Sequence, residues 1–148
     1  MMNKEKYFLI SFLVLIFSFP PKLDAQAISD WKLQMLDVAG RTNVNGVEVY
    51  VQTSTCQNEI VVLIKFVNHN AYPVTVKWFD AVQTQAHEWI KNDDPALKKS
   101  QAIDANSEIK GDCLTNSYLE CIVNIKDFIG KQNKFNEYSI YHFEASPL

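Results

Sequence analysis

The chain of 148 residues has room for one domain of ordinary size and hardly for two. Hydrophobic residues make up 47% and charged residues 21% of the sequence, which argues against a disordered chain, a coiled coil and a polytopic membrane protein. The formal net charge of -3 leaves no surplus of basic side chains to neutralise a phosphate backbone. We therefore expect one folded domain with no nucleic-acid partner.

The N-terminal segment has the three parts of a secretory signal peptide. Lys4 and Lys6 form a basic region, the uncharged stretch Tyr7–Phe19 follows, and the small residues of Ala25–Ala27 offer a cleavage site. The apolar stretch is shorter than the roughly 20 residues that span a bilayer, and Pro20–Pro21 ends any helix there. We predict a signal peptide over residues 1–25, cleavage after residue 25 or 27, and no stable membrane insertion afterwards.

The domain that remains after cleavage, residues 26–148, carries 11 basic and 15 acidic side chains, a net charge of -4. Export would place it outside the cytoplasm, either secreted or periplasmic, in an oxidising compartment. Its length is enough for one hydrophobic core, yet small enough for a disulfide to contribute appreciably to stability.

The first strand signals lie before residue 56. An Asn-Gly pair inside Val44–Val47 predicts a tight hairpin. Val47, Val49 and Val51 then alternate with other side chains, so we expect the three valines on one face of a half-exposed strand. The segment Cys56–Glu59 ends this strand.

The run Ile60–Val67 is the strongest strand signal, because every position except Lys65 is apolar. It predicts a central strand covered on both sides. One face would consist of alternate residues, namely Ile60, Val62, Ile64 and Phe66. The polar turn Asn68–Pro73 leads to a second alternating segment with Val74, Val76 and Trp78 on one face, and we expect the two segments to pair antiparallel.

The segment Thr84–Ser100 is mostly polar, and its large apolar residues are only Trp89, Ile90 and Leu97. We expect a long loop with one helical turn, of a length typical of functional or disordered connections. Shorter strands are expected at Ile103–Ile109, at Cys121–Ile125 and, after a turn at Gly130–Asn136, at Tyr138–Phe143.

Six or seven short strands without a convincing amphipathic helix predict an all-β fold, an antiparallel β-sandwich. The stretch Glu59–Phe79 (EIVVLIKFVNHNAYPVTVKWF) resembles the paired middle strands of immunoglobulin-like and fibronectin-like sandwiches. The chain is also similar to small exported bacterial domains in which a Gly-Asp-Cys sequence, here Gly111–Cys113, follows the next strand. The resemblance implies an immunoglobulin-like β-sandwich and carries no catalytic residue across.

Three cysteines remain after export, so one is unpaired within a monomer. Cys121 opens the alternating segment Cys121–Ile125 and should point into the core, where a thiol packs like a small apolar group. Cys56 and Cys113 both lie in polar turns, and we favour a disulfide between them. It would close a 57-residue interval and stabilise the fold by about 3 to 4 kcal/mol. A bond from Cys113 to Cys121, or no stable bond, remains an alternative.

The sequence has no motif for catalysis or for a cofactor. It lacks Cys-x-x-Cys, His-x-His, His-Glu-x-x-His and Gly-x-Ser-x-Gly, and its four glycines form no phosphate loop. His87–Glu88 with Asp93–Asp94 could hold a divalent ion only if the loop folded back, and a solvated acidic loop is the simpler interpretation. Carboxylates for acid-base work could come from four scattered residues, Asp80, Glu88, Asp104 and Glu120. We expect no enzyme, no cofactor and no metal site.

Trp89 and Ile90 are the candidate partner-binding residues, because an aromatic residue in the most polar segment could anchor a protein or a sugar ring. Packing of this loop onto the sheet is the alternative. The leading hypothesis is an exported, non-enzymatic binding or interaction module for an extracytoplasmic protein or carbohydrate. Two other hypotheses are a small hydrolase or metal-assisted enzyme with its site in Thr84–Ser100, and an accessory subunit that docks through an exposed strand edge.

Overall fold

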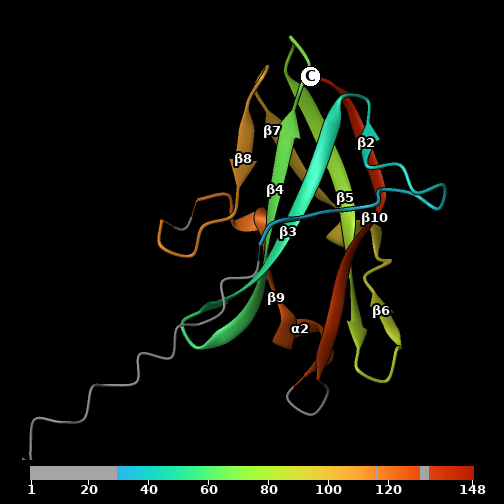
Figure 1. Cartoon of the computed structure of the whole chain (residues 1–148), viewed down its shortest axis with the longest axis vertical. Helices are drawn as coiled ribbons and strands as arrows, with labels where there is room; N and C mark the ends of the chain where they lie inside the picture. Colours follow the sequence, from blue (N-terminus) through green and yellow to red (C-terminus); the bar gives the residue numbers. More distant parts are fainter. Residues whose placement is uncertain (1–29, 116, 131–133) are drawn as a thin grey trace, which may run out of the picture.

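The computed structural model describes residues 30–115, 117–130 and 134–148. The expected signal peptide, residues 1–25, lies outside the described residues. Within the described ranges, no helix has the length and apolar character needed to cross a bilayer. The described chain is mainly β-structure in two antiparallel sheets that face each other (Figure 1), which confirms the predicted all-β class.

The first sheet, here called sheet A, has the strand order β1-β3-β4-β8, with β2 also beside β3 and β9 also beside β4. Its two long strands form a ten-residue hairpin pair in the centre. The bounds of its strands are β1 Lys32–Leu33, β2 Asn43–Val44, β3 Val47–Cys56, β4 Glu59–Asn68, β8 Glu108–Lys110 and β9 Ile122–Asn124.

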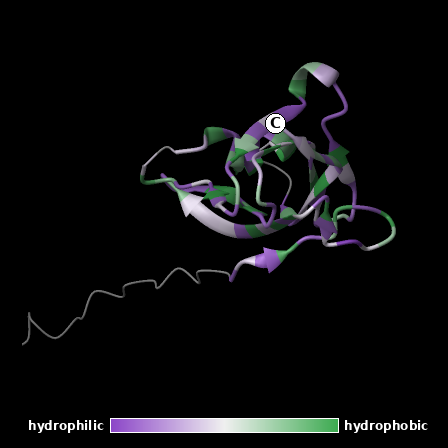
Figure 2. Cartoon of the chain, turned by 90° about the horizontal axis from the view of Figure 1, so that it is seen from above, coloured by the Kyte–Doolittle hydropathy of each residue, from purple (hydrophilic) through white to green (hydrophobic). Residues whose placement is uncertain are grey.

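The second sheet, sheet B, has the order β10-β5-β6, with β7 also beside β5. Its bounds are β5 Val74–Thr84, β6 Trp89–Lys91, β7 Lys99–Ile103 and β10 Phe135–Pro147. Seen from above, the strands of the two sheets surround one interior (Figure 2). The described residues thus form ten strands rather than six or seven, since several edge strands of two or three residues carry no alternating pattern.

Both tight turns of sheet A use left-handed backbone conformations. Asn45 and Gly46 have φ angles of 49° and 77° and join β2 to β3, as the Asn-Gly pair predicts. Gln57 and Asn58, with φ angles of 51° and 66°, make the equivalent turn between β3 and β4. A side chain at Gly46 would collide with Asn70, because a Cβ there would lie 2.4 Å from its amide oxygen.

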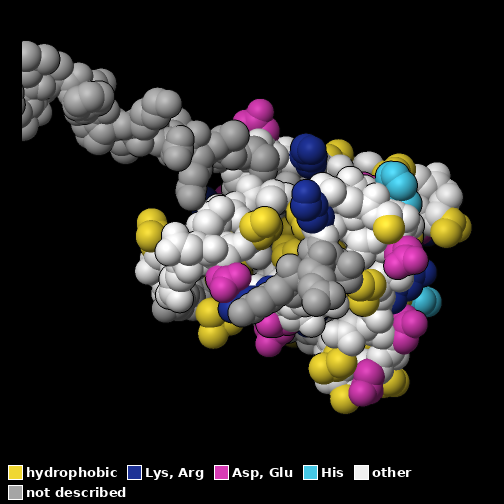
Figure 3. All heavy atoms as spheres, turned by 90° about the horizontal axis from the view of Figure 1, so that it is seen from below, with side chains coloured by type: hydrophobic (Ala, Val, Ile, Leu, Met, Phe, Trp, Pro, Cys, Tyr) yellow, Lys and Arg dark blue, Asp and Glu magenta, His cyan; other side chains and the backbone are white. Residues whose placement is uncertain are grey.

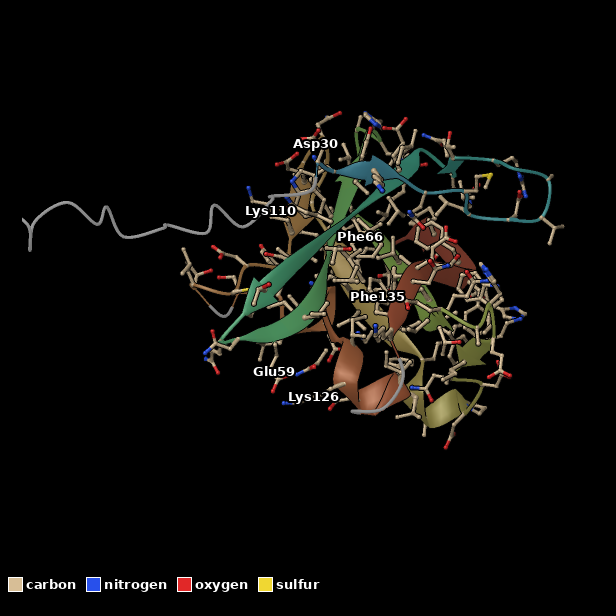
Figure 4. All side chains as sticks on the ribbon, turned by 60° about the horizontal axis from the view of Figure 1, so that its bottom comes forward. Asp30, Glu59, Phe66, Lys110, Lys126 and Phe135 are labelled. Carbon is tan, nitrogen blue, oxygen red and sulfur yellow. A yellow bond between two sulfur atoms is a disulfide. The ribbon has the colours of Figure 1, made fainter. Side chains whose placement is uncertain are left out.

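The interior is filled by the predicted alternating residues. On β3, Val47, Val49 and Val51 are all at most 8% exposed, and on β4 the side chain of Ile64 is fully buried. Phe66 points between the sheets (Figure 4), and its ring centroid lies 4.8 Å from that of the buried Trp78. Such tilted aromatic contacts stabilise a core beyond the area they bury.

Ile60 departs from the expected burial, since it is 50% exposed. It directly follows Glu59, the first residue of β4, at the tip of the β3–β4 hairpin, which curves away from sheet B (Figure 1). The alternation places Ile60 on the correct side of the strand, but no opposite sheet covers it there.

The segments Ile60–Val67 and Val74–Trp78 do not pair, contrary to the prediction. β4 lies in sheet A and β5 in sheet B, so the turn Asn68–Pro73 crosses from one sheet to the other. Asn68 holds this crossing, because its buried amide donates to the backbone oxygens of Tyr72 at 3.0 Å and Asp104 at 2.9 Å. Strand periodicity predicts each strand, but it does not distinguish a hairpin from a crossing between sheets.

The predicted loop Thr84–Ser100 is largely regular structure. It contains β6, the 3-10 turn η1 at Pro95–Leu97 and the start of β7. These short strands pair with two different parts of β5, so backbone hydrogen bonding holds a segment that has few apolar side chains of its own. The expected strand Ile103–Ile109 is likewise divided into the end of β7, a turn and the start of β8.

The region predicted as a strand at Cys121–Ile125 contains three different elements. The 3-10 turn η2 (Leu119–Cys121) precedes β9, and the helix α2 (Ile125–Ile129) follows it. The side chain of Asn124 caps α2 by accepting a hydrogen bond from the Lys126 backbone N at 3.3 Å, which stops the strand. Alternate residues remain buried nonetheless, and Cys121 and Val123 are 0% and 2% exposed.

Candidate functional site

Trp89 and Ile90 lie on opposite faces of sheet B. In the pairing of β6 with β5, Ile90 stands opposite the buried Val82 and packs against the core, whereas Trp89 stands opposite Gln83. The indole is therefore on the outer face of the sheet, where it is 41% exposed. Of the two predicted partner-binding residues, only Trp89 is positioned to meet a ligand.

Three more rings share this outer face. Phe79 of β5 is paired with Tyr141 of β10, and their ring centroids are 5.5 Å apart. The ring of His142 lies 5.2 Å from Tyr141 and 6.2 Å from Phe79. We call the surface formed by Phe79, Trp89, Tyr141 and His142 the aromatic face.

A β-bulge brings Tyr141 and His142 together. The register of β10 against β5 slips by one residue between Tyr141 and Glu144, and His142 has a φ angle of 49°. Phe143 turns inward and stacks on Phe66, with ring centroids 6.1 Å apart. A regular strand would have turned His142 inward, so the bulge adds the His142 ring to the outer surface.

Lysine ammonium groups lie over two of the rings. The Lys91 Nζ is 5.5 Å from the Tyr141 centroid, and the Lys98 Nζ is 5.7 Å from the Phe79 centroid. Lys98 also forms an ion pair with Glu144 at 2.8 Å. Lys91 stands opposite Ala81 of β5, and its side chain reaches from β6 to the Tyr141 ring of β10.

The hydroxyl of Tyr141 donates a hydrogen bond to the carboxylate of Asp93. Partial burial, and then this bond to a carboxylate, raise the pKa of Tyr141 well above its usual value. The phenol is therefore a permanent donor at neutral pH. Asp94, next in the chain, is also occupied, since it caps η1 by accepting from Ala96 N at 2.9 Å.

A second feature is a polar cleft of about 430 Å³ between the two sheets, lined by β7, η1, β9 and α2. Its charged lining consists of Asp80, Lys98, Lys99, Glu120 and Asp127. Of the four carboxylates considered for acid-base work, only Asp80 and Glu120 reach this cleft.

Three protein groups bind the Asp80 carboxylate. It is 5% exposed, accepts from the Trp78 indole at 3.1 Å and the Tyr138 hydroxyl at 2.6 Å, and pairs with the Lys99 ammonium at 2.8 Å. Burial, and then the Asp80 charge, raise the pKa of Tyr138 well above its usual value. The arrangement therefore stabilises the buried Asp80 carboxylate by one ion pair and two hydrogen bonds.

The histidines are dispersed among different parts of the fold. His69 lies 3.1 Å from Glu48 on the outer face of sheet A, His87 is in the turn before β6, and His142 belongs to the aromatic face. In the parts of the chain that the structure describes, no three His, Cys, Asp or Glu side chains come close enough to hold a metal ion.

The predicted disulfide joins Cys56 to Cys113, with their Cα atoms 5.7 Å apart. It ties the tip of the β3–β4 hairpin to the loop after β8. Cys121 is free and fully buried, as predicted from its place in an alternating segment. Burial raises the pKa of its thiol to about 12.

Most of the aromatic face could not be found from the sequence. Phe79 and Tyr141 are 62 positions apart, and only the pairing of the first and last long strands of sheet B brings them together. The run YSIYHF contains Tyr141 and His142, the two β10 members of the aromatic face, but no sequence signal there indicates the bulge. No protein-family model, curated protein or solved structure matches the chain.

Proposed function

We propose that this protein is an exported, non-enzymatic binding module that holds its ligand on the aromatic face. The observation that supports this most is the gathering of four rings on one outer surface, where they do not contribute to the core between the sheets. Surface aromatics combine a large apolar area with little conformational freedom, and they dominate binding energies where they occur.

The proposed location outside the cytoplasm rests on the N-terminal sequence and gains support from the Cys56–Cys113 disulfide, which suits an oxidising compartment. We further propose that the sandwich is immunoglobulin-like. Two consecutive long strands in opposite sheets, with a fully buried Trp78 on the second, support this assignment.

The two other hypotheses receive less support. For an enzyme, Asp80 and Lys99, which line the cleft and are largely buried, neutralise one another. For assembly through a strand edge, β10 is the long outer strand of sheet B, but its bulge interrupts a regular edge. The Asn45 amide also donates to the Ala145 backbone oxygen at 2.7 Å, which occupies part of that edge.

Binding can be tested by cosedimentation of the full chain, produced through a secretory route, with the extracytoplasmic fraction of its source organism. Trp89→Ala should weaken this binding by about thirtyfold or more, as expected of a hot-spot residue, and change the free energy of unfolding by about 1 kcal/mol or less. Trp31→Ala is the matched control, since Trp31 is a partly exposed tryptophan near Lys65 of sheet A.

Equal losses from the two tryptophan variants would place binding elsewhere and contradict the proposal. A large loss of stability in Trp89→Ala, with binding retained, would show that the indole serves packing alone.

A further inference from the structure

We infer that the ligand of the aromatic face is an uncharged carbohydrate chain. This inference rests on the proposed function and names the chemistry of the same site. A pyranose ring presents C–H groups on its faces and hydroxyl groups around its rim. Its polarised hydrogens fit the electron-rich face of an aromatic ring, and its hydroxyls need polar groups beside that ring.

The rings are spread along the strands as an extended ligand would require. Trp89 lies opposite Gln83, and Tyr141 lies opposite Phe79, four residues earlier in β5. At the usual rise per strand residue this offsets the two ring positions by about 13 Å along the strands, and β5 lies between them. One compact ligand group would not reach both, whereas a linear chain could contact one ring at each end.

Polar groups suited to hydroxyls lie beside the indole. Gln83 stands opposite Trp89 on one side and Glu137 on the other, and the Asn136 amide donates to the Gln83 side-chain oxygen at 2.6 Å. This leaves further amide hydrogens and lone pairs available to a ligand. At the other end, the Lys98–Glu144 pair flanks Phe79.

The charge on this surface favours an uncharged ligand. Three lysines, Lys77, Lys91 and Lys98, are balanced by three carboxylates, Asp93, Glu137 and Glu144. An acidic polysaccharide would need a surplus of basic groups, because opposite surface potentials are what attract a charged ligand.

The surface is also less suited to a protein partner. A stable protein interface buries about 800 Å² on each side around an apolar centre. The aromatic face lies on β5, β6 and β10. Among the described residues of these three strands, Trp89 is the only large hydrophobic residue that is exposed. Its cross-strand neighbour Gln83 is polar, and Lys91, the next outward-facing residue of β6, is charged. At the end of the molecule seen from below, hydrophobic side chains are scattered among other types (Figure 3).

The test uses the full chain and three defined polymers in affinity gel electrophoresis: a soluble β-glucan, a galactomannan and polygalacturonate. We expect at least one of the two uncharged polymers to retard the protein, with little dependence on salt. Trp89→Ala and Tyr141→Ala should weaken retardation by about thirtyfold, and Trp31→Ala should leave it unchanged. Circular dichroism of each variant separates loss of binding from loss of fold.

A second arm treats the extracytoplasmic fraction with periodate, which cleaves the vicinal diols of sugars, or with protease. Loss of binding after periodate supports the inference. Loss after protease alone, or retardation by polygalacturonate alone, would overturn it. If Trp89→Ala still abolishes binding in the protease-sensitive case, the binding module stands and only the carbohydrate assignment fails.

Discussion

The Lys99 ammonium lies 2.8 Å from the Asp80 carboxylate, and this ion pair links β7 to β5 at the bottom of the polar cleft. The side chains are 19% and 5% exposed, respectively. Lys99 also donates to the Glu120 backbone oxygen at 2.9 Å. One ammonium group thus connects sheet B to the turn η2, next to the buried Cys121, and we assign it a structural role.

Replacing Lys99 should be costly because Asp80 would stay buried without its cation. Lys99→Met should lower the free energy of unfolding by about 2 to 3 kcal/mol, as expected for loss of a charged hydrogen bond in a buried site. The double variant Asp80→Asn/Lys99→Met should lose less than the sum of the single variants, because the two groups interact. Urea denaturation of the three variants measures this coupling.

The matched control is the exposed ion pair between Lys126 and Glu59, 3.1 Å apart and each 46% exposed (Figure 4). Lys126→Met makes the same chemical change and should cost about 1 kcal/mol or less, since exposed pairs contribute little. If the two lysine variants lost equal stability, the Asp80–Lys99 pair would have no special weight in the fold.

The features that the sequence predicts are those set by residues close together in the chain. Burial of Val47, Val49, Ile64 and Trp78 follows from alternation within single strands, and the Asn-Gly turn follows from local backbone geometry. The Cys56–Cys113 bond was predicted because the alternation assigned Cys121 to the core.

The features that depend on long-range pairing were not predictable. The assignment of β4 and β5 to different sheets requires knowledge of what each strand meets across the chain. The same holds for the contact between the rings of Phe79 and Tyr141. It also holds for the burial of Asp80, because its partners Tyr138 and Lys99 come from other strands and nothing in the local sequence distinguishes it from the other acidic residues. Trp89 was found because an aromatic residue in a polar segment is conspicuous without any partner.

The buried thiol of Cys121 should be unreactive in the folded protein. Thiolates, not thiols, are the reactive species, and burial raises the pKa of this group to about 12, so it stays protonated at mildly alkaline pH. Iodoacetamide should therefore modify no cysteine in the native, non-reduced protein and exactly one residue, Cys121, in denaturant. Mass spectrometry of the peptides gives both results.

The rate of native-state labelling would then report how often this region opens. Fast labelling of Cys121 without denaturant would mean that η2 and β9 open readily. Labelling of Cys56 or Cys113 in the non-reduced, denatured protein would contradict the disulfide assignment.

The last prediction concerns acid stability and the carboxylate of Glu48. Its oxygen Oε2 lies 3.1 Å from the His69 ring and accepts from the Tyr50 hydroxyl at 2.9 Å. The bond to His69, followed by the bond to Tyr50, lowers the pKa of Glu48 below its ordinary value of 4.5. A carboxyl with a lowered folded-state pKa stabilises the protein above its unfolded-state pKa, and this contribution disappears as the pH falls through the lowered value.

Glu48→Gln should therefore reduce the free energy of unfolding at neutral pH by about 1 kcal/mol or less, and the difference from the parent protein should shrink as the pH falls below 4.5.

Glu108→Gln is the matched control. Both glutamates pair with Val67, one from each side of β4, so they share a row on the same face of sheet A, but Glu108 is exposed. Removing the same charge at Glu108 should give a smaller difference with little pH dependence, as measured by urea denaturation at neutral pH and at about pH 3. Identical pH profiles for the two variants would show that only net charge, and not the contact of Glu48 with His69 and Tyr50, determines the acid response.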